Sequence, residues 1–65
     1  MEDLETLKTK VKKLNAQATQ AKMDLHDLSE ELPTNWESIL DVAQKAYDSH
    51  QSLMAARKEL ASATA

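Results

Sequence analysis

The sequence predicts an all-α protein: an antiparallel two-helix hairpin, coiled-coil-like in its packing, that assembles into a helical bundle oligomer. Two observations lead to this prediction. The chain of 65 residues has no glycine and one proline, so its composition favours helix almost everywhere. That proline, Pro33, lies between two stretches with helical periodicity. We therefore expect one domain, residues 1–65, with a helix over about 3–31, a turn over about 32–35 and a helix over about 36–62.

The first helix carries a regular heptad pattern. Its apolar residues follow one another in alternating steps of three and four: Leu4, Leu7, Val11, Leu14, Ala18, Ala21, Leu25, Leu28 and Leu32. Apolar residues at the a and d positions of a heptad form a stripe that packs against another helix. Because the period is 3.5 residues, the pattern predicts a left-handed supercoil with a partner helix.

The turn is predicted from Pro33, which has no backbone N–H to donate and which disfavours helical geometry at Leu32. Thr34 is a good N-cap for the second helix, and Glu37 follows three residues later, so this pair predicts a capping box. Asn35 is the alternative cap. A connection this short makes the two helices antiparallel neighbours.

The second helix is apolar over a wider face, with two overlapping seams. One seam contains Ile39, Ala43, Ala46, His50, Leu53, Arg57 and Leu60, and the other contains Leu40, Ala43, Tyr47, His50, Met54 and Ala61. One seam can pack on the first helix, and nothing in the chain remains to cover the other. We therefore expect self-association through Leu40, Tyr47, His50 and Met54, as a homodimer or a tetramer.

Composition excludes several classes of function. A chain without cysteine has no thiol chemistry and no Cys-ligated zinc or iron–sulfur site. It has no nucleophile elbow, Gly-rich loop or identifiable pair of catalytic carboxylates, so we expect no enzyme. No apolar run is long enough for a signal peptide or a membrane span, and we expect a cytoplasmic protein. The net charge of −3 argues against nucleic acid, and we expect the lysine band over residues 8–13 to face acids of a neighbouring subunit.

Two histidines are candidate metal ligands. His26 and Glu30 are four residues apart on one helix face, and imidazole with carboxylate suits iron, nickel or zinc. The alternative is a solvated acidic face. His50 lies where the two seams overlap and would need ligands from another helix or subunit. Its alternative role is that of a core or interface histidine that sets the register of the helices.

The region around the turn is a candidate partner surface. It comprises Asp27, Glu30, Glu31, Trp36, Glu37 and Asp41. Glu30 and Glu31 fall at the carboxyl end of the first helix, where the helix dipole disfavours negative charge, so a cation or a basic partner would relieve them. Trp36 either seals the end of the hairpin against Leu28 and Leu32 or is an exposed contact for a partner.

The block from Asp27 to Leu53, DLSEELPTNWESILDVAQKAYDSHQSL, resembles the central motif of small Rop-like, NifX-associated proteins found with nitrogen-fixation genes. The resemblance implies a hairpin that oligomerises in the setting of nitrogenase maturation or maintenance, and it implies no reaction. We therefore expect a non-enzymatic accessory or adapter protein. The alternatives are a small protein that binds Fe, Ni or Zn and, by analogy with Rop, an RNA-binding protein.

Overall fold

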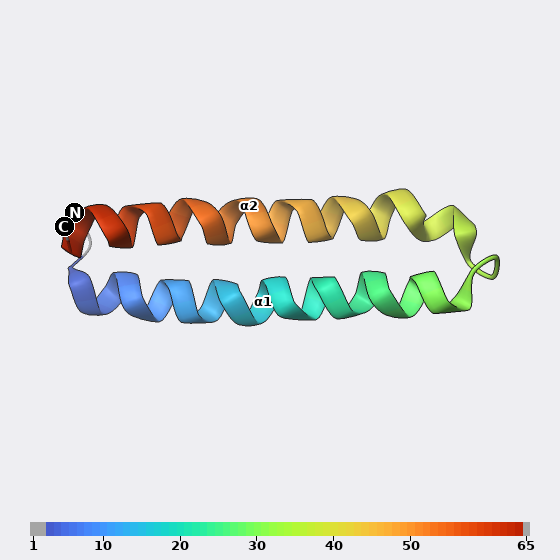
Figure 1. The fold of residues 1–65 in the computed structure, drawn as a ribbon, viewed down its shortest axis with the longest axis horizontal. Helices are drawn as coiled ribbons and strands as arrows, with labels where there is room; N and C mark the ends of the chain where they lie inside the picture. Colours follow the sequence, from blue (N-terminus) through green and yellow to red (C-terminus); the bar gives the residue numbers. More distant parts are fainter. Residues whose placement is uncertain (1–2, 65) are drawn as a thin grey trace.

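A computed structural model of the chain describes residues 3–64 and shows two long helices joined by a short turn (Figure 1). The elements are α1 (Leu4–Glu31), the 3₁₀ helix η1 (Trp36–Ser38) and α2 (Ile39–Thr64). α1 and α2 run side by side in opposite directions over a length of 46 Å, with cross-sections of 16 and 14 Å. The described part of the chain contains no strand, and the predicted all-α hairpin is confirmed. None of the described helices is long and apolar enough to cross a membrane.

α1 begins at a side-chain cap and ends at the residue before proline. The Thr6 backbone N–H donates to the Asp3 carboxylate over 2.8 Å, and this hydrogen bond lowers the pKa of Asp3 from its ordinary value. At the other end, Leu32 has an extended backbone with ψ of 142°, because helical geometry before proline brings a steric clash. The Leu32 N–H still donates to the Leu28 carbonyl over 3.1 Å.

The turn is built from backbone hydrogen bonds and one left-handed residue. The Thr34 N–H donates to the Glu31 carbonyl over 3.0 Å, and the Trp36 N–H donates to the Pro33 carbonyl over 3.3 Å. The Leu32–Pro33 peptide bond is cis. Asn35 has a φ of 61°, a conformation that asparagine tolerates better than most residues other than glycine.

The predicted capping box of Thr34 and Glu37 is wrong. Thr34 lies inside the turn, and the next helix begins two residues later, at Trp36. Asn35 directly precedes η1, but its side chain makes no cap hydrogen bond there. Its amide instead donates to the Glu31 carboxylate, with 3.4 Å between Nδ2 and Oε2. The 3₁₀ helix η1 therefore begins with backbone hydrogen bonds and without a side-chain cap.

The core between the helices is thin. Among residues 3–64, seven apolar residues are buried: Leu7, Ala18, Ala21, Leu28, Ala46, Leu53 and Ala56. Four of these are alanines, so the two backbones approach closely while little side-chain volume is buried. Ala56, with 1% exposure, is the most buried of the set. A core this small stabilises a short chain weakly by itself.

α2 is rotated relative to the first predicted seam. Ala46, Leu53 and Ala56 are buried, and the flanking Val42 and Leu60 are half-buried. Ile39 and His50, which the sequence placed in a seam of the same helix, are exposed. The line that packs on α1 passes instead through Val42, Ala46, Ser49, Leu53, Ala56 and Leu60. The small residues Ser49 and Ala56 therefore take the places that the first predicted seam gave to His50 and Arg57.

Candidate functional site

The hairpin carries opposite charges at its two ends. Residues 24–41, around the turn, contain six carboxylates and no lysine or arginine: Asp24, Asp27, Glu30, Glu31, Glu37 and Asp41. All six side chains are exposed. We call this region the acidic turn. Part of it borders a shallow groove where Asp27 and Glu31 of α1 lie across from Val42 of α2, so carboxylates of α1 lie beside the start of α2.

The other end of the hairpin is basic. We call residues 1–15 and 55–65 the basic end, because they hold more cations, Lys8, Lys10, Lys12, Lys13, Arg57 and Lys58, than carboxylates, Glu2, Asp3, Glu5 and Glu59. The Arg57 guanidinium donates to the Asn15 side-chain oxygen across the two helices, with 3.4 Å between Nη2 and Oδ1. Lys10 of one helix and Lys58 of the other line one groove, which Leu7 and Glu59 also border. Folding the hairpin thus brings cations of both helices together.

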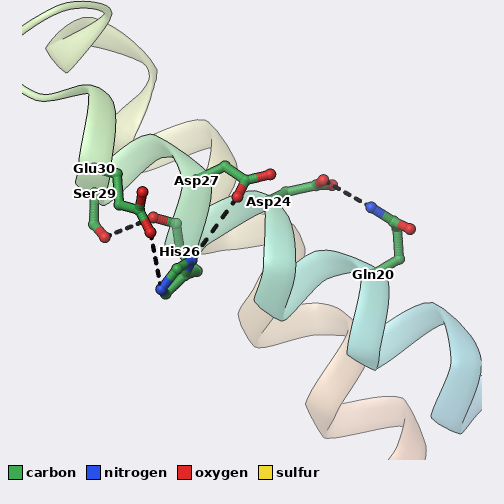
Figure 2. Close-up of polar contacts among 6 residues, drawn as sticks. All are labelled: Gln20, Asp24, His26, Asp27, Ser29 and Glu30. Carbon is green, nitrogen blue, oxygen red and sulfur yellow. Dashed lines mark hydrogen bonds and ion pairs between the residues drawn. The ribbon is translucent and has the colours of Figure 1, made fainter.

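His26 lies within the acidic turn and contacts two carboxylates (Figure 2). Its Nε2 is 3.2 Å from Glu30 Oε1, and its Nδ1 is 3.8 Å from Asp27 Oδ1. All three side chains are about two-thirds or more exposed, so these contacts contribute little to stability. Nearby, the Ser29 hydroxyl donates to the His26 carbonyl over 2.7 Å. The Asp24 carboxylate accepts a hydrogen bond from Gln20 over 3.0 Å.

The predicted metal ligands do not meet within one chain. Between residues 3 and 64, no group of three or more His, Cys, Asp or Glu residues is arranged to hold a metal ion. The structure brings His26 and Glu30 together on α1 and leaves His50 on α2, outside this pair. Two ligands on a solvated helix face hold a divalent ion weakly unless further ligands come from elsewhere.

The carboxyl end of α1 has the unfavourable charge that the sequence predicts. Glu30 and Glu31 are in its last turn, which contains no basic residue. The Asn35 amide partly compensates Glu31. Trp36 is 62% exposed and Leu32 is 39% exposed, whereas Leu28 is buried. Within one chain, the tryptophan is therefore an exposed apolar group in the acidic turn.

A second candidate surface runs along α2. Leu40, Tyr47 and Met54 repeat every seven residues on one helix face and are 82%, 66% and 58% exposed. His50 lies between Tyr47 and Met54, and these three residues border a shallow groove with Ala46 and Gln51. We call Leu40, Tyr47, His50 and Met54 the α2 stripe. Large apolar side chains in a row are uncommon on the surface of a monomer and mark contact surfaces.

The orientation of the His50 ring is set by the backbone of α2. Its Nδ1 is 2.8 Å from the Ala46 carbonyl oxygen. A carbonyl oxygen only accepts, so Nδ1 carries the hydrogen, and Nε2 of the neutral ring carries a lone pair. The sequence identified His50 as a residue of interest, but not this hydrogen bond, which depends on the side-chain rotamer.

Comparison with known proteins places the chain in a family. A family model described as Rop-like matches residues 2–65, and the chain therefore belongs to the Rop-like family. This match confirms the resemblance to Rop-like proteins that residues 27–53 carry. An NMR structure from the Northeast Structural Genomics Consortium is 56% identical, with a TM-score of 0.88 over 97% of this chain and 89% of that chain.

Two relatives are informative. A UPF0437 protein of Azorhizobium caulinodans is 60% identical over 60 residues, which cover 92% of this chain and 87% of the relative. A protein of Frankia alni, described as a UPF0437 protein in the nifX-nifW intergenic region, is 43% identical over 51 residues. The match covers 78% of this chain and 62% of the Frankia protein.

Proposed function

We propose that the protein is a non-enzymatic accessory or adapter protein of nitrogen fixation that works as a self-associated helical bundle. The observation that carries the proposal is the α2 stripe, which one hairpin leaves exposed. The setting comes from the Frankia alni relative, whose description places it between nifX and nifW. In this setting we assign the protein to the maturation or maintenance of nitrogenase.

The surface of one hairpin is too large for a compact monomer. Its solvent-accessible surface is 5180 Å², whereas a compact monomer of this mass exposes about 4,200 Å². The excess of about 1,000 Å² is close to the roughly 800 Å² that each partner buries in a standard protein interface. The radius of gyration is 14.7 Å, against about 11 Å for a compact domain of this length. Both quantities support a hairpin that is one half of a bundle.

Charge favours one orientation of the two copies. The acidic turn and the basic end lie at opposite ends of the hairpin. If the two turns pointed the same way, six carboxylates would lie beside six carboxylates. With the turns at opposite ends, each acidic turn lies beside the basic end of the other copy. This arrangement places the acidic turn of one copy near the lysines of the other, and we therefore favour self-association over RNA as the role of these lysines.

The acidic turn with Trp36 is our candidate surface for a second protein. Tryptophan is enriched among residues that dominate binding energy, and Trp36 is 62% exposed. Carboxylates around it suit a partner with a basic surface. The Trp36 ring would supply apolar contact and the carboxylates would supply orientation.

The first test is thermal unfolding over a range of protein concentrations, with mass measured by light scattering. We expect the mass of an oligomer at micromolar concentration and a melting temperature that rises with concentration, because association is linked to folding. A monomer whose melting temperature does not change with concentration would refute the assembly.

The second test is a pull-down from nitrogen-fixing cells with the wild type and a Trp36→Ala variant. We expect a nitrogen-fixation protein to be retained by the wild type and lost from the variant. A matched control is Met23→Ala, which removes an apolar side chain with 54% exposure from α1, just before the acidic turn begins. Equal recovery by all three proteins would remove Trp36 from the proposed surface.

A further inference from the structure

We propose that two copies of the chain bind one divalent transition-metal ion between their His50 side chains. The inference rests on the proposed self-association and goes beyond it, because each chain supplies one imidazole and neither has the site alone. Metal ions that imidazole nitrogen favours, such as Zn²⁺, Ni²⁺ and Co²⁺, are the ligand class. Water would complete the coordination.

The first support is the position of His50 along α2. α2 runs from Ile39 to Thr64, so His50 lies within two residues of its midpoint. When two copies pack with their turns at opposite ends, a two-fold axis crosses the helices near mid-length. A residue close to that axis approaches the same residue of the other copy. His50 is therefore the ligand-bearing residue of α2 that approaches its own copy.

The second support is the self-complementary spacing of the α2 stripe. If Tyr47 lies opposite Met54 of the other copy, the axis falls between His50 and Gln51. The same register places Leu40 opposite the small Ala61, so a large residue meets a small one there. An antiparallel pairing of the stripe with itself thus covers its exposed apolar residues and brings the two His50 rings together.

The third support is the chemistry of the ring. The Nδ1–H of His50 is held by the Ala46 carbonyl at 2.8 Å, which directs the Nε2 lone pair away from the backbone of α2. Histidines that bind metal commonly donate their other ring N–H to a carbonyl or carboxylate, which fixes the tautomer. The hydrogen bond of the His50 ring is thus made by Nδ1 and not by Nε2.

His26 provides the matched comparison. It lies near the end of α1, far from mid-length, and its Nε2 faces Glu30 of the same chain at 3.2 Å. A site at His26 would bind one ion per chain. A site at His50 would bind one ion per two chains, so stoichiometry distinguishes the two positions.

The test is a titration of the chelator-stripped protein with Co²⁺ and Zn²⁺, followed by calorimetry and by the visible spectrum of Co²⁺. We expect saturation at one ion per two chains and a higher melting temperature. We expect His26→Ala to behave like the wild type and His50→Gln to bind at least tenfold more weakly. A direct measurement needs no variant: Zn²⁺ should shift the ¹⁵N resonance of His50 Nε2 in the wild-type protein.

The outcomes separate this inference from the proposed assembly. An oligomer with no saturable site, or with one ion per chain lost in His26→Ala, overturns the shared His50 site and leaves the assembly in place. A ¹⁵N shift at His26 without one at His50 would likewise overturn the shared His50 site and leave the assembly in place. A monomer at every concentration, measured without metal, overturns both proposals.

Discussion

The Asp3 carboxylate precedes α1 and accepts the Thr6 backbone N–H, which lowers the pKa of Asp3. A lowered pKa means that the ionised group stabilises the folded state above its unfolded pKa, near 3.8, and that this stabilisation is lost as the pH falls through the folded value. We predict that Asp3→Asn, which keeps a capping oxygen, loses this pH dependence. The check is urea unfolding of both proteins between pH 3 and pH 7. An equal response of both proteins to pH would contradict the prediction.

Asn35 is a residue whose backbone conformation decides which substitutions it tolerates. Its φ of 61° suits glycine and disfavours β-branched residues. We predict that Asn35→Val lowers the free energy of unfolding by about 1–2 kcal/mol. Asn35→Gly should stay close to the wild type, since glycine adopts this conformation freely. Denaturant titration of both variants measures the difference, and equal losses would show that the left-handed conformation is not the cause.

At the scale of elements, the close approach of α1 and α2 depends on small residues. Ala56 is 1% exposed, whereas its neighbour Ala55 is exposed. We predict that Ala56→Leu destabilises the protein by about 1–3 kcal/mol, because the larger side chain forces the helices apart. Ala55→Leu is the matched control and should change stability by less than about 0.5 kcal/mol. If Ala55→Leu were the more destabilising change, the assigned rotation of α2 would be wrong.

The turn separates two segments that are both strong helix formers. We predict that Pro33→Ala lets α1 and α2 join into one longer helix and gives an assembly of different mass. Thr34→Ala is the control: Thr34 is an exposed turn residue and is not the N-cap of η1, so its loss should cost less than about 0.5 kcal/mol. Light scattering and small-angle X-ray scattering measure mass and length. An unchanged Pro33→Ala hairpin would show that other residues set the turn.

At the scale of the whole molecule, the orientation of two copies can be measured directly. The chain has no cysteine, so a single introduced cysteine carries one spin label per copy. For Ser62→Cys, turns at opposite ends predict labels about 35 Å apart along the helix axis. Gln51→Cys, near the proposed axis, should give a short distance. A short distance at both positions would mean that the two turns lie at the same end.

The two helices, the position of the turn and the charge distribution follow from local sequence. Two helices and an antiparallel connection are predicted from the heptad steps of α1, the absence of glycine and the position of Pro33. These features are local, because helix propensity and the geometry before proline act over a few residues. The charge separation between the acidic turn and the basic end also follows, since it depends on the order of residues and on the hairpin alone. The family resemblance was carried by the block around the turn and is confirmed.

The candidate site was only partly predictable. The sequence identified Leu40, Tyr47, His50 and Met54 as a face that one hairpin cannot cover. It did not identify the hydrogen bond that orients His50, because that bond depends on a side-chain rotamer. It also assigned Trp36 a sealing role as one alternative, whereas the structure leaves this ring exposed in one chain.

Tertiary structure decided the rotation of α2 and the conformation of the turn. The two seams of α2 overlap, so periodicity could not say which line faces α1. The line with Ser49 and Ala56 packs on α1, because small side chains let the two helices approach closely. In the turn, backbone hydrogen bonds and the left-handed Asn35 replaced the predicted capping box. The sequence by itself determined the helices and where they break, because those depend on neighbours in the chain; only packing decided which faces remain exposed.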